Sequence, residues 1–407
     1  MVDEHSAVLA QNYALGVSVV GFFLYPFFNR CFKKQVKQIC IAALAIVAVC
    51  CVLLMEQRLT YDLILFPGMG TFLILGLFGG ATYHLAASMI ETDRYLARQV
   101  GIAYAMSILL QFANNNLVHS DLIEMVILSI FLLGLVVLLV KTEQTLDVPV
   151  SSAGGTIEGG AVTTGKFAAH RSNEAITGVL LALLVALMAC IFSTLDNAVT
   201  LEHAAGKTDI GQWPRILLAC SGLIAGFIFD IKRRDFMNII MFCVMMLSTI
   251  GVAILQLGGS FLIGLIIFYL SSGFFVVFFT SSFMELSYHM RVPELWAGMG
   301  RTANNICTVF ITSGSLALIN SRNSIMEIAL VLILFVAVSI VMAVYIAKRK
   351  AVMEDLNQGA AIDVYKRQPK PCRAFSPIAP SPRANWVIKD CTSSYPQIWR
   401  TWGGRLS

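Results

Sequence analysis

The dominant pattern along the chain is a succession of long apolar runs separated by short polar segments. A bilayer core about 30 Å thick requires about 20 apolar residues per helix. Eleven runs of this kind are present, at 8–29, 38–55, 63–88, 99–118, 121–140, 175–195, 214–230, 236–256, 261–284, 300–319 and 325–347. Isolated strands cannot satisfy their backbone groups in hydrocarbon, so each run is predicted to be a helix. The pattern predicts an all-α polytopic membrane protein with about eleven transmembrane helices.

Composition supports this class, because 57% of the 407 residues are hydrophobic and only 13% are charged. Soluble domains carry about 25% charged residues, so lipid must be the solvent for much of this chain. The net charge is +5, and residues 351–407 supply four of these charges. The rest is nearly neutral, which argues against nucleic-acid binding. The ten cysteines form no CxxC pair, so we expect no metal site, disulfide framework or cofactor.

The loops indicate how the helices are oriented. Alternate loops are rich in Lys and Arg: Arg30, Lys33, Lys34 and Lys37; Arg94 and Arg98; Lys141, Lys166 and Arg171; Lys232, Arg233 and Arg234; Arg291; Lys348, Arg349 and Lys350. Such loops face the cytoplasm, so we expect a multi-pass plasma-membrane protein whose residue 350 end is cytoplasmic. Met1 then lies outside, and a missing first helix is the simplest explanation.

Polar segments divide the apolar runs into five and six. The Gly- and Ser-rich segment 142–174 is predicted to be a flexible cytoplasmic linker between a first bundle, 1–141, and a second, 175–350. Residues 351–407 carry many prolines and show no amphipathic period, so disorder is expected there. The stretch Asp363–Gln368 resembles a run found at artefactual ends of translated sequence assemblies, which suggests that the residues after it are not native.

The two halves contain related segments. The third run ends in Ser-Met-Ile-Glu at 88–91 and the ninth in Ser-Phe-Met-Glu at 282–285, 194 residues later. A short loop containing Arg and a Gly-containing helix follow each segment. The shared position in the topology indicates an internal repeat.

The clearest local motif lies between the seventh and eighth runs. It combines Gly226 and Asp230 with the basic residues Lys232, Arg233 and Arg234. Gly226 permits close helix contact, Asp230 can cap a neighbouring helix, and the basic residues anchor at the interface. In the first half Gly21 is followed by Tyr25 in place of the aspartate, then by Arg30, Lys33 and Lys34.

This motif resembles the glycine–aspartate–basic signature of the major facilitator superfamily, which follows the second helix of each six-helix half. The resemblance covers about residues 8–350, mainly through topology. It implies a two-bundle fold in which the runs are family helices two to twelve. It also implies alternating access to a central site, with residues 226–234 as a gating motif. Tyr25 leaves the corresponding pair of the first half in doubt.

Polar residues inside the runs are the candidates for a cavity, because they are costly in lipid. We name Tyr83, His84, Gln111, Asn114, Asp196, Asn197 and Tyr269 as candidate cavity residues. His84 could carry a coupling proton. Each also has a structural interpretation, as a hydrogen-bonded interior group or a helix end. Trp213 and Arg215 are interpreted as an interfacial anchor at the start of a run.

No motif indicates catalysis, so an enzyme is not expected. The segment Gly160–Phe167 has Walker A spacing, but Phe167 replaces the Ser or Thr that binds magnesium and no apolar strand precedes it. The predicted function is secondary transport of a small solute. The alternative is a transporter-like membrane sensor of a bacterial regulator whose C-terminal DNA-binding domain is missing.

Overall fold

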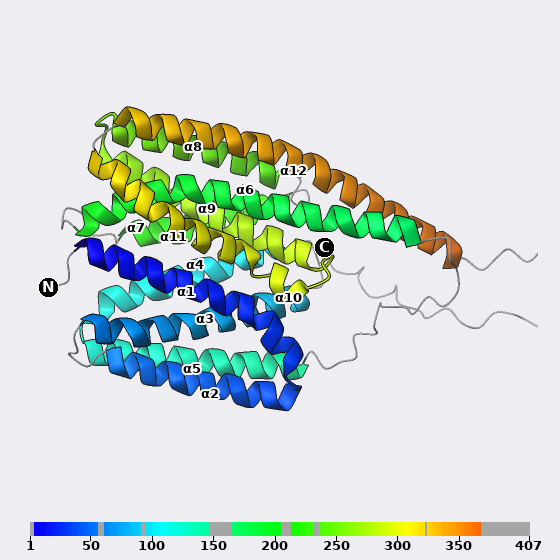
Figure 1. The fold of residues 1–407 in the computed structure, drawn as a ribbon, viewed down its shortest axis with the longest axis horizontal. Coiled ribbons are helices and arrows are strands. Elements are labelled where there is room, and N and C mark those ends of the chain that lie inside the picture. The colour runs from blue at the N-terminus through cyan, green and yellow to red at the C-terminus, as the bar shows by residue number, and fades with distance from the viewer. Residues whose placement is uncertain are drawn as a thin grey trace, which may run out of the picture. The chain divides into compact units, whose positions relative to one another are not determined.

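The computed structural model describes residues 4–55, 61–90, 95–145, 164–204, 213–231, 236–321 and 324–367. These residues form twelve helices: α1 (Glu4–Cys31), α2 (Lys34–Met55), α3 (Tyr61–Met89), α4 (Leu96–Leu117), α5 (Asp121–Thr145), α6 (Thr164–Ala204), α7 (Trp213–Phe229), α8 (Met237–Gln256), α9 (Phe261–Ser287), α10 (Pro293–Trp296), α11 (Met299–Ser321) and α12 (Ser324–Arg367). The long helices run side by side (Figure 1). Apart from the four-residue α10, each overlaps one predicted apolar run.

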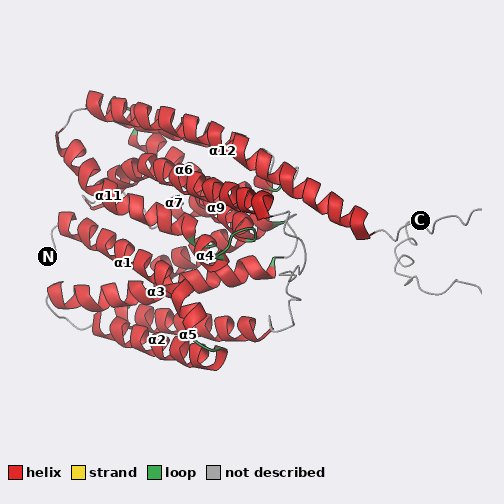
Figure 2. Cartoon of the chain, turned by 45° about the vertical axis from the view of Figure 1, so that its right-hand side comes forward, coloured by secondary structure: helices red, strands yellow, loops and turns green. Residues whose placement is uncertain are grey.

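Nine of the helices in the described part are long and apolar enough to cross a membrane. The apolar helix α7 is shorter, at 17 residues, and α11 does not meet the same measure. The predicted fold class, an all-helical multi-span membrane protein, is confirmed. The view in Figure 2 shows helix as the regular structure of the described residues, as the backbone argument requires.

The first half is built around α3, which packs against α1, α2 and α5. Glycine allows α1 and α3 to approach closely, since a Cβ on Gly76 would collide with the Ser18 carbonyl. A Cβ on Gly21 would likewise collide with the Leu73 carbonyl. The apolar core here is small, with Phe78 fully buried at its centre.

The second half is built around α9, which packs against α6, α7 and α8, while α11 packs against α6. The larger apolar core of the protein lies mainly in this half, is rich in phenylalanine, and also takes in Leu96, Ala97 and Val100 of α4. Phe229 of α7 meets Phe274 and Phe278 of α9 edge to face. The α12 helix joins this half through Phe335, which packs on Phe242 of α8. Arg349 of α12 also forms an ion pair with Glu285 of α9, in which Arg349 Nη2 donates to both carboxylate oxygens, Oε1 at 3.1 Å and Oε2 at 2.9 Å.

The two most extensive packing contacts between the halves are α4 with α7, and α1 with α11. Gly101 and Gly226 bring the α4 and α7 backbones together. Between α1 and α11, the Asn305 amide donates to the Ser18 hydroxyl at 3.1 Å. Both of these residues are buried, so the contact lies inside the protein.

Two expected irregular segments are partly helical. Residues 164–174, assigned to the linker, begin α6, and residues 351–367, assigned to the tail, end α12. Both stretches continue an apolar helix into polar sequence that contains good helix formers such as Ala, Glu and Lys. By contacts the chain divides into Met1–Leu356 and Asn357–Ser407. The four-part division drawn from the sequence stays a prediction.

Candidate functional site

Most polar contacts between the halves, within the described residues, lie where the basic ends of the helices meet. We call this region the basic end: the C-terminus of α1, the N-terminus of α4, Asp230 after α7, and the connection from α9 to α11. The Asn305–Ser18 contact lies apart from it. Asp230 follows α7, and its carboxylate accepts hydrogen bonds from the Ala97 and Arg98 backbone amides at 3.2 and 2.8 Å. These amides belong to the first turn of α4, where backbone donors lack intrahelical partners and the helix dipole favours an anion. Asp230 therefore caps a helix of the other half.

Gly226 sets how closely α7 approaches the capped helix. A Cβ at this position would lie 2.7 Å from the Ala97 carbonyl oxygen and 3.0 Å from Gly101 Cα. A larger residue would push α4 away and lengthen the Asp230 hydrogen bonds. The basic part of the predicted gating motif, Lys232, Arg233 and Arg234, lies outside the described residues.

The first half uses different residues for its own contact. Tyr25, which stands at the aspartate position, is buried inside this half, with its ring centroid 6.0 Å from that of His84. One turn later, Asn29 donates to Glu294 at 3.3 Å, and Arg30 forms an ion pair with Glu294 at 3.1 Å. Glu294 lies on α10, in the second half. We call Asn29, Arg30 and Glu294 the clasp.

Glu294 is held ionised by its neighbours. Burial alone would raise the pKa of Glu294, but its backbone hydrogen bond and Arg30 outweigh burial, and the pKa falls below its ordinary value. A carboxylate that is partly buried and hydrogen-bonded in its charged form is a stable partner for Arg30. The clasp is therefore a charged contact at neutral pH.

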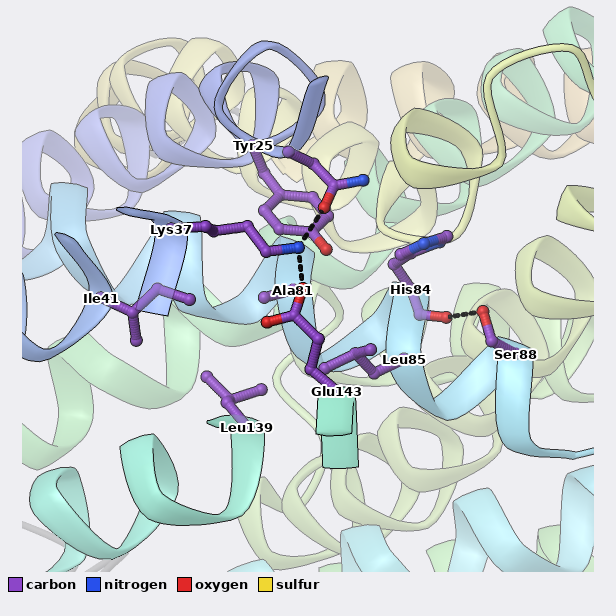
Figure 3. A pocket seen from close by; sticks show the side chains of 10 residues that line it. Tyr25, Lys37, Ile41, Ala81, His84, Leu85, Ser88, Leu139 and Glu143 are labelled. Carbon is purple, nitrogen blue, oxygen red and sulfur yellow. Dashed lines mark hydrogen bonds and ion pairs between the residues drawn. The ribbon is translucent and has the colours of Figure 1, made fainter. Parts of the chain in front are cut away.

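A cavity of about 280 Å³ opens behind the clasp, among α1, α2, α3 and α5 (Figure 3). His84 lines this cavity together with Tyr25, Asn29 and Ser88. Across it, the Lys37 ammonium group forms an ion pair with Glu143. The candidate His84 therefore lies within the first half, beside an ion pair.

A second polar group lies where the halves face each other. Tyr104 of α4 interacts electrostatically with residues of α3, α7, α9 and α11, and Tyr269 with residues of α6 and α7. We call this set the central cluster: Tyr83, Tyr104, Asp196, Arg215, Tyr269 and Arg301. Of its members, Tyr83, Asp196 and Tyr269 were candidates from the sequence.

The other candidates lie apart from this cluster. Gln111 is exposed on α4, and Asn114 donates to Glu124 of α5 at 3.1 Å. Asn197 is buried on α6, and its amide nitrogen has no hydrogen-bond partner within the described residues. A buried unpaired donor costs free energy unless water or a solute supplies an acceptor.

Sequence reasoning missed Tyr104, Arg215 and Arg301 as members of the central cluster. The two arginines could have been found from the sequence, because a charged residue inside a membrane span is costly and indicates a polar surrounding. Arg301 falls within the run 300–319, and Arg215 lies at the start of the run 214–230. Arg215 was interpreted as an interfacial anchor. The Lys37–Glu143 pair joins residues 106 positions apart, and no local sequence pattern predicts such a pair.

No protein-family model matches the chain, and no curated protein matches it. Among solved structures, the chain is similar to a mutant form of the nucleoside transporter NupG. The identity is 17% and the TM-score 0.44, over 84% of this chain and 90% of that one.

Proposed function

We propose that this chain is a secondary transporter of the major facilitator type, which moves a small solute by alternating access. The supporting observation is the distribution of polar contacts between the halves. At the basic end the halves are joined by the Asp230 cap, by the clasp, and by Tyr288, whose hydroxyl donates to the Ile90 carbonyl at 2.6 Å. A set of exchangeable polar contacts at one end suits two bundles that rock about a central site.

The basic end is cytoplasmic in this proposal, because Lys and Arg gather there. The described conformation is then closed toward the cytoplasm. Opening requires the Asp230 cap and the clasp to exchange their partners for water. The hydrogen bonds to the Asp230 carboxylate are each worth about 1.5–3 kcal/mol. The clasp is worth about 1 kcal/mol or less, because the Arg30 side chain is 52% exposed. Binding of a solute can offset amounts of this size.

The central cluster is the proposed solute site. It carries two arginines against one aspartate, together with three tyrosines whose hydroxyl groups can donate and accept hydrogen bonds. Such a set suits a small organic solute with several polar groups. Arg215 and Arg301 are the residues on which we expect solute recognition to depend most.

We propose that the first half of the transporter has one further helix, which packs against α4. In the second half α11 packs against α6, whereas the extensive contacts of α4, its counterpart, are with α7 and α9 of the other half. The remaining face of α4 presents Ile102, Met106 and Leu110, which are 43%, 54% and 49% exposed. An apolar helix on this face would complete the symmetry of the two bundles.

The test is release of solutes from proteoliposomes. Vesicles loaded with a mixture of small metabolites are assayed by mass spectrometry for compounds lost only when the protein is present. The matched control carries cysteines at Arg30 and Glu294, cross-linked so that the clasp cannot open. Release that stops on cross-linking supports transport; an absence of any protein-dependent release, with correctly folded protein, argues against it.

A further inference from the structure

The cavity of Figure 3 is separate from the central cluster. Its walls come from α1, α2, α3 and α5, all within the first half, whereas the central cluster draws on both halves. Its volume of about 280 Å³ equals that of about nine water molecules at roughly 30 Å³ each. A ligand of about the size of a small amino acid would fit.

The charges inside this cavity are balanced. The side chains of Lys37 and Glu143 are only 12% and 15% exposed, and they pair with each other. The Lys37 ammonium group also donates to Asn29 Oδ1 at 2.7 Å. Tyr25, His84 and Ser88 add polar groups that can bond a ligand. The cavity thus offers one cation, one anion and several neutral partners.

The balance of one cation and one anion in the cavity indicates the class of ligand that it can bind. A simple anion that takes Lys37 from Glu143 would remove the closest cation from that carboxylate, although Lys34, which donates to the Glu143 backbone carbonyl at 3.4 Å, would stay nearby. A simple cation that takes Glu143 would likewise break the ion pair of the Lys37 ammonium group. Removing one partner of a buried pair is strongly unfavourable. A molecule carrying both an ammonium and a carboxylate group avoids this cost, since it can pair with Glu143 and Lys37 together.

The cavity is also joined to the clasp by a continuous set of polar contacts. Asn29 accepts from Lys37 through Oδ1 and donates to Glu294 through Nδ2. Glu294 in turn holds Arg30. The position of the Lys37 ammonium group therefore bears directly on a contact between the halves.

We propose that this cavity is a binding site for a small zwitterion, an α-amino acid with a neutral side chain, and that the bound ligand loosens the clasp. The ligand carboxylate draws Lys37 away from Asn29, which then holds Glu294 less firmly. By linkage, the ligand binds more tightly when the basic end is open. The effect on opening rests on the proposed transport function, whereas binding itself does not.

Binding is tested with three matched probes: L-alanine, propionate and ethylammonium. The two last lack the ammonium and the carboxylate of alanine respectively. Thermal unfolding of the full chain in detergent is measured over a range of probe concentrations. We expect propionate and ethylammonium each to bind at least tenfold more weakly than L-alanine. L-alanine should therefore raise the Tm at concentrations at which neither of the other two probes changes it. Equal effects of all three, or none from L-alanine, would overturn the proposal.

The charged pair is tested by the double substitution Lys37→Met with Glu143→Leu, which keeps apolar packing in place of the ions. We expect at least a tenfold loss of L-alanine affinity. The matched control is Arg349→Met with Glu285→Leu, which removes a similarly covered ion pair of the other half. Retained binding in the first variant, or equal loss in the control, contradicts the assignment. The probe comparison on the unaltered chain decides the question if the first variant fails to fold.

Coupling to the clasp is tested by Arg30→Gln, which removes the clasp ion pair and leaves every cavity-lining residue in place. Spin labels at Phe32 and Arg291 report the separation of the halves at the basic end. L-alanine is expected to lengthen this distance in the unaltered sequence. In the Arg30→Gln variant, whose clasp is already loosened, it is expected to bind with a smaller lengthening. Binding with no change in either chain would overturn the coupling. This readout does not depend on solute transport, so it separates failure of this inference from failure of the proposed function.

Discussion

Asp230 and Arg98 belong to different halves of the protein, yet the Asp230 carboxylate accepts the Arg98 backbone N–H at 2.8 Å. The hydrogen bond places a negative charge at the start of α4, where the helix dipole stabilises it. The contact needs only the backbone of α4, so it is independent of the Arg98 side chain, which lies instead over the Phe227 ring, 4.6 Å from its centroid.

Replacing Asp230 with Asn is expected to open the basic end. Asn keeps one acceptor oxygen but loses the charge, which is worth about 1 kcal/mol at a helix N-terminus. The ratio of closed to open molecules should fall about fivefold. Distance measurements between labels at Phe32 and Arg291 report this ratio. Asp121→Asn, at the exposed start of α5, is the control and should leave the ratio unchanged.

Gly226→Ala is expected to destabilise the protein, because its Cβ would lie 2.7 Å from the Ala97 carbonyl oxygen. Overpacking of this kind costs about 1–3 kcal/mol, which would lower the Tm in detergent by several degrees. The matched control is Gly134→Ala on α5, where an added Cβ meets nothing within 4 Å. Equal Tm values for the two variants would show that α4 and α7 do not pack as described.

The clasp should weaken only in acid. The Glu294 pKa is lowered in the closed state. Ionised Glu294 therefore stabilises the closed state at every pH above the ordinary glutamate pKa of about 4.3. This stabilisation is lost as the pH falls through the lowered pKa. We expect the Phe32–Arg291 distance to be constant from neutral pH to about pH 5 and to lengthen below it. Arg30→Gln should weaken the clasp at neutral pH and reduce the pH dependence. A transition that is unchanged in Arg30→Gln would assign it to another group.

The packing of α6 on α11 predicts an oxidative cross-link. The thiols of Cys190 on α6 and Cys307 on α11 interact across this packing, and nearby Ser193 donates to Thr308 at 3.3 Å. Treatment with a disulfide oxidant should join the two thiols. After cleavage at a protease site engineered between residues 205 and 212, the fragments should stay together until a reductant is added. Separation of the oxidised fragments, as expected for the Cys190→Ser control, would contradict this packing.

The sequence predicts the helices well because span length and apolar runs are local properties, fixed by bilayer thickness. Asp230 could be found for a similar reason: a glycine, an aspartate and basic residues stand within nine positions. The Arg30–Glu294 pair could not, since 264 residues separate its partners. Tyr25 shows the same limit, because its burial against His84 depends on how α1 packs on α3.

His84 shows what the sequence could and could not indicate about the cavity of the first half. An ionisable residue inside an apolar run indicated a polar interior position, and the structure puts His84 in a polar cavity. The sequence did not indicate that this cavity lies within the first half or that Lys37 and Glu143 share it. Those residues stand near helix ends, where charge is ordinary and carries no signal of burial.

Alternating access is tested most directly by measuring two distances in one set of samples, in proteoliposomes and with a cysteine-free background. Labels at Phe32 and Arg291 report the basic end, and labels at Tyr13 and Trp213, which are 51% and 44% exposed, report the opposite end. When Asp230→Asn and Arg30→Gln are combined, the first distance should lengthen while the second shortens. Two distances that stay fixed, or that lengthen together, would contradict a transporter whose halves rock about a central site.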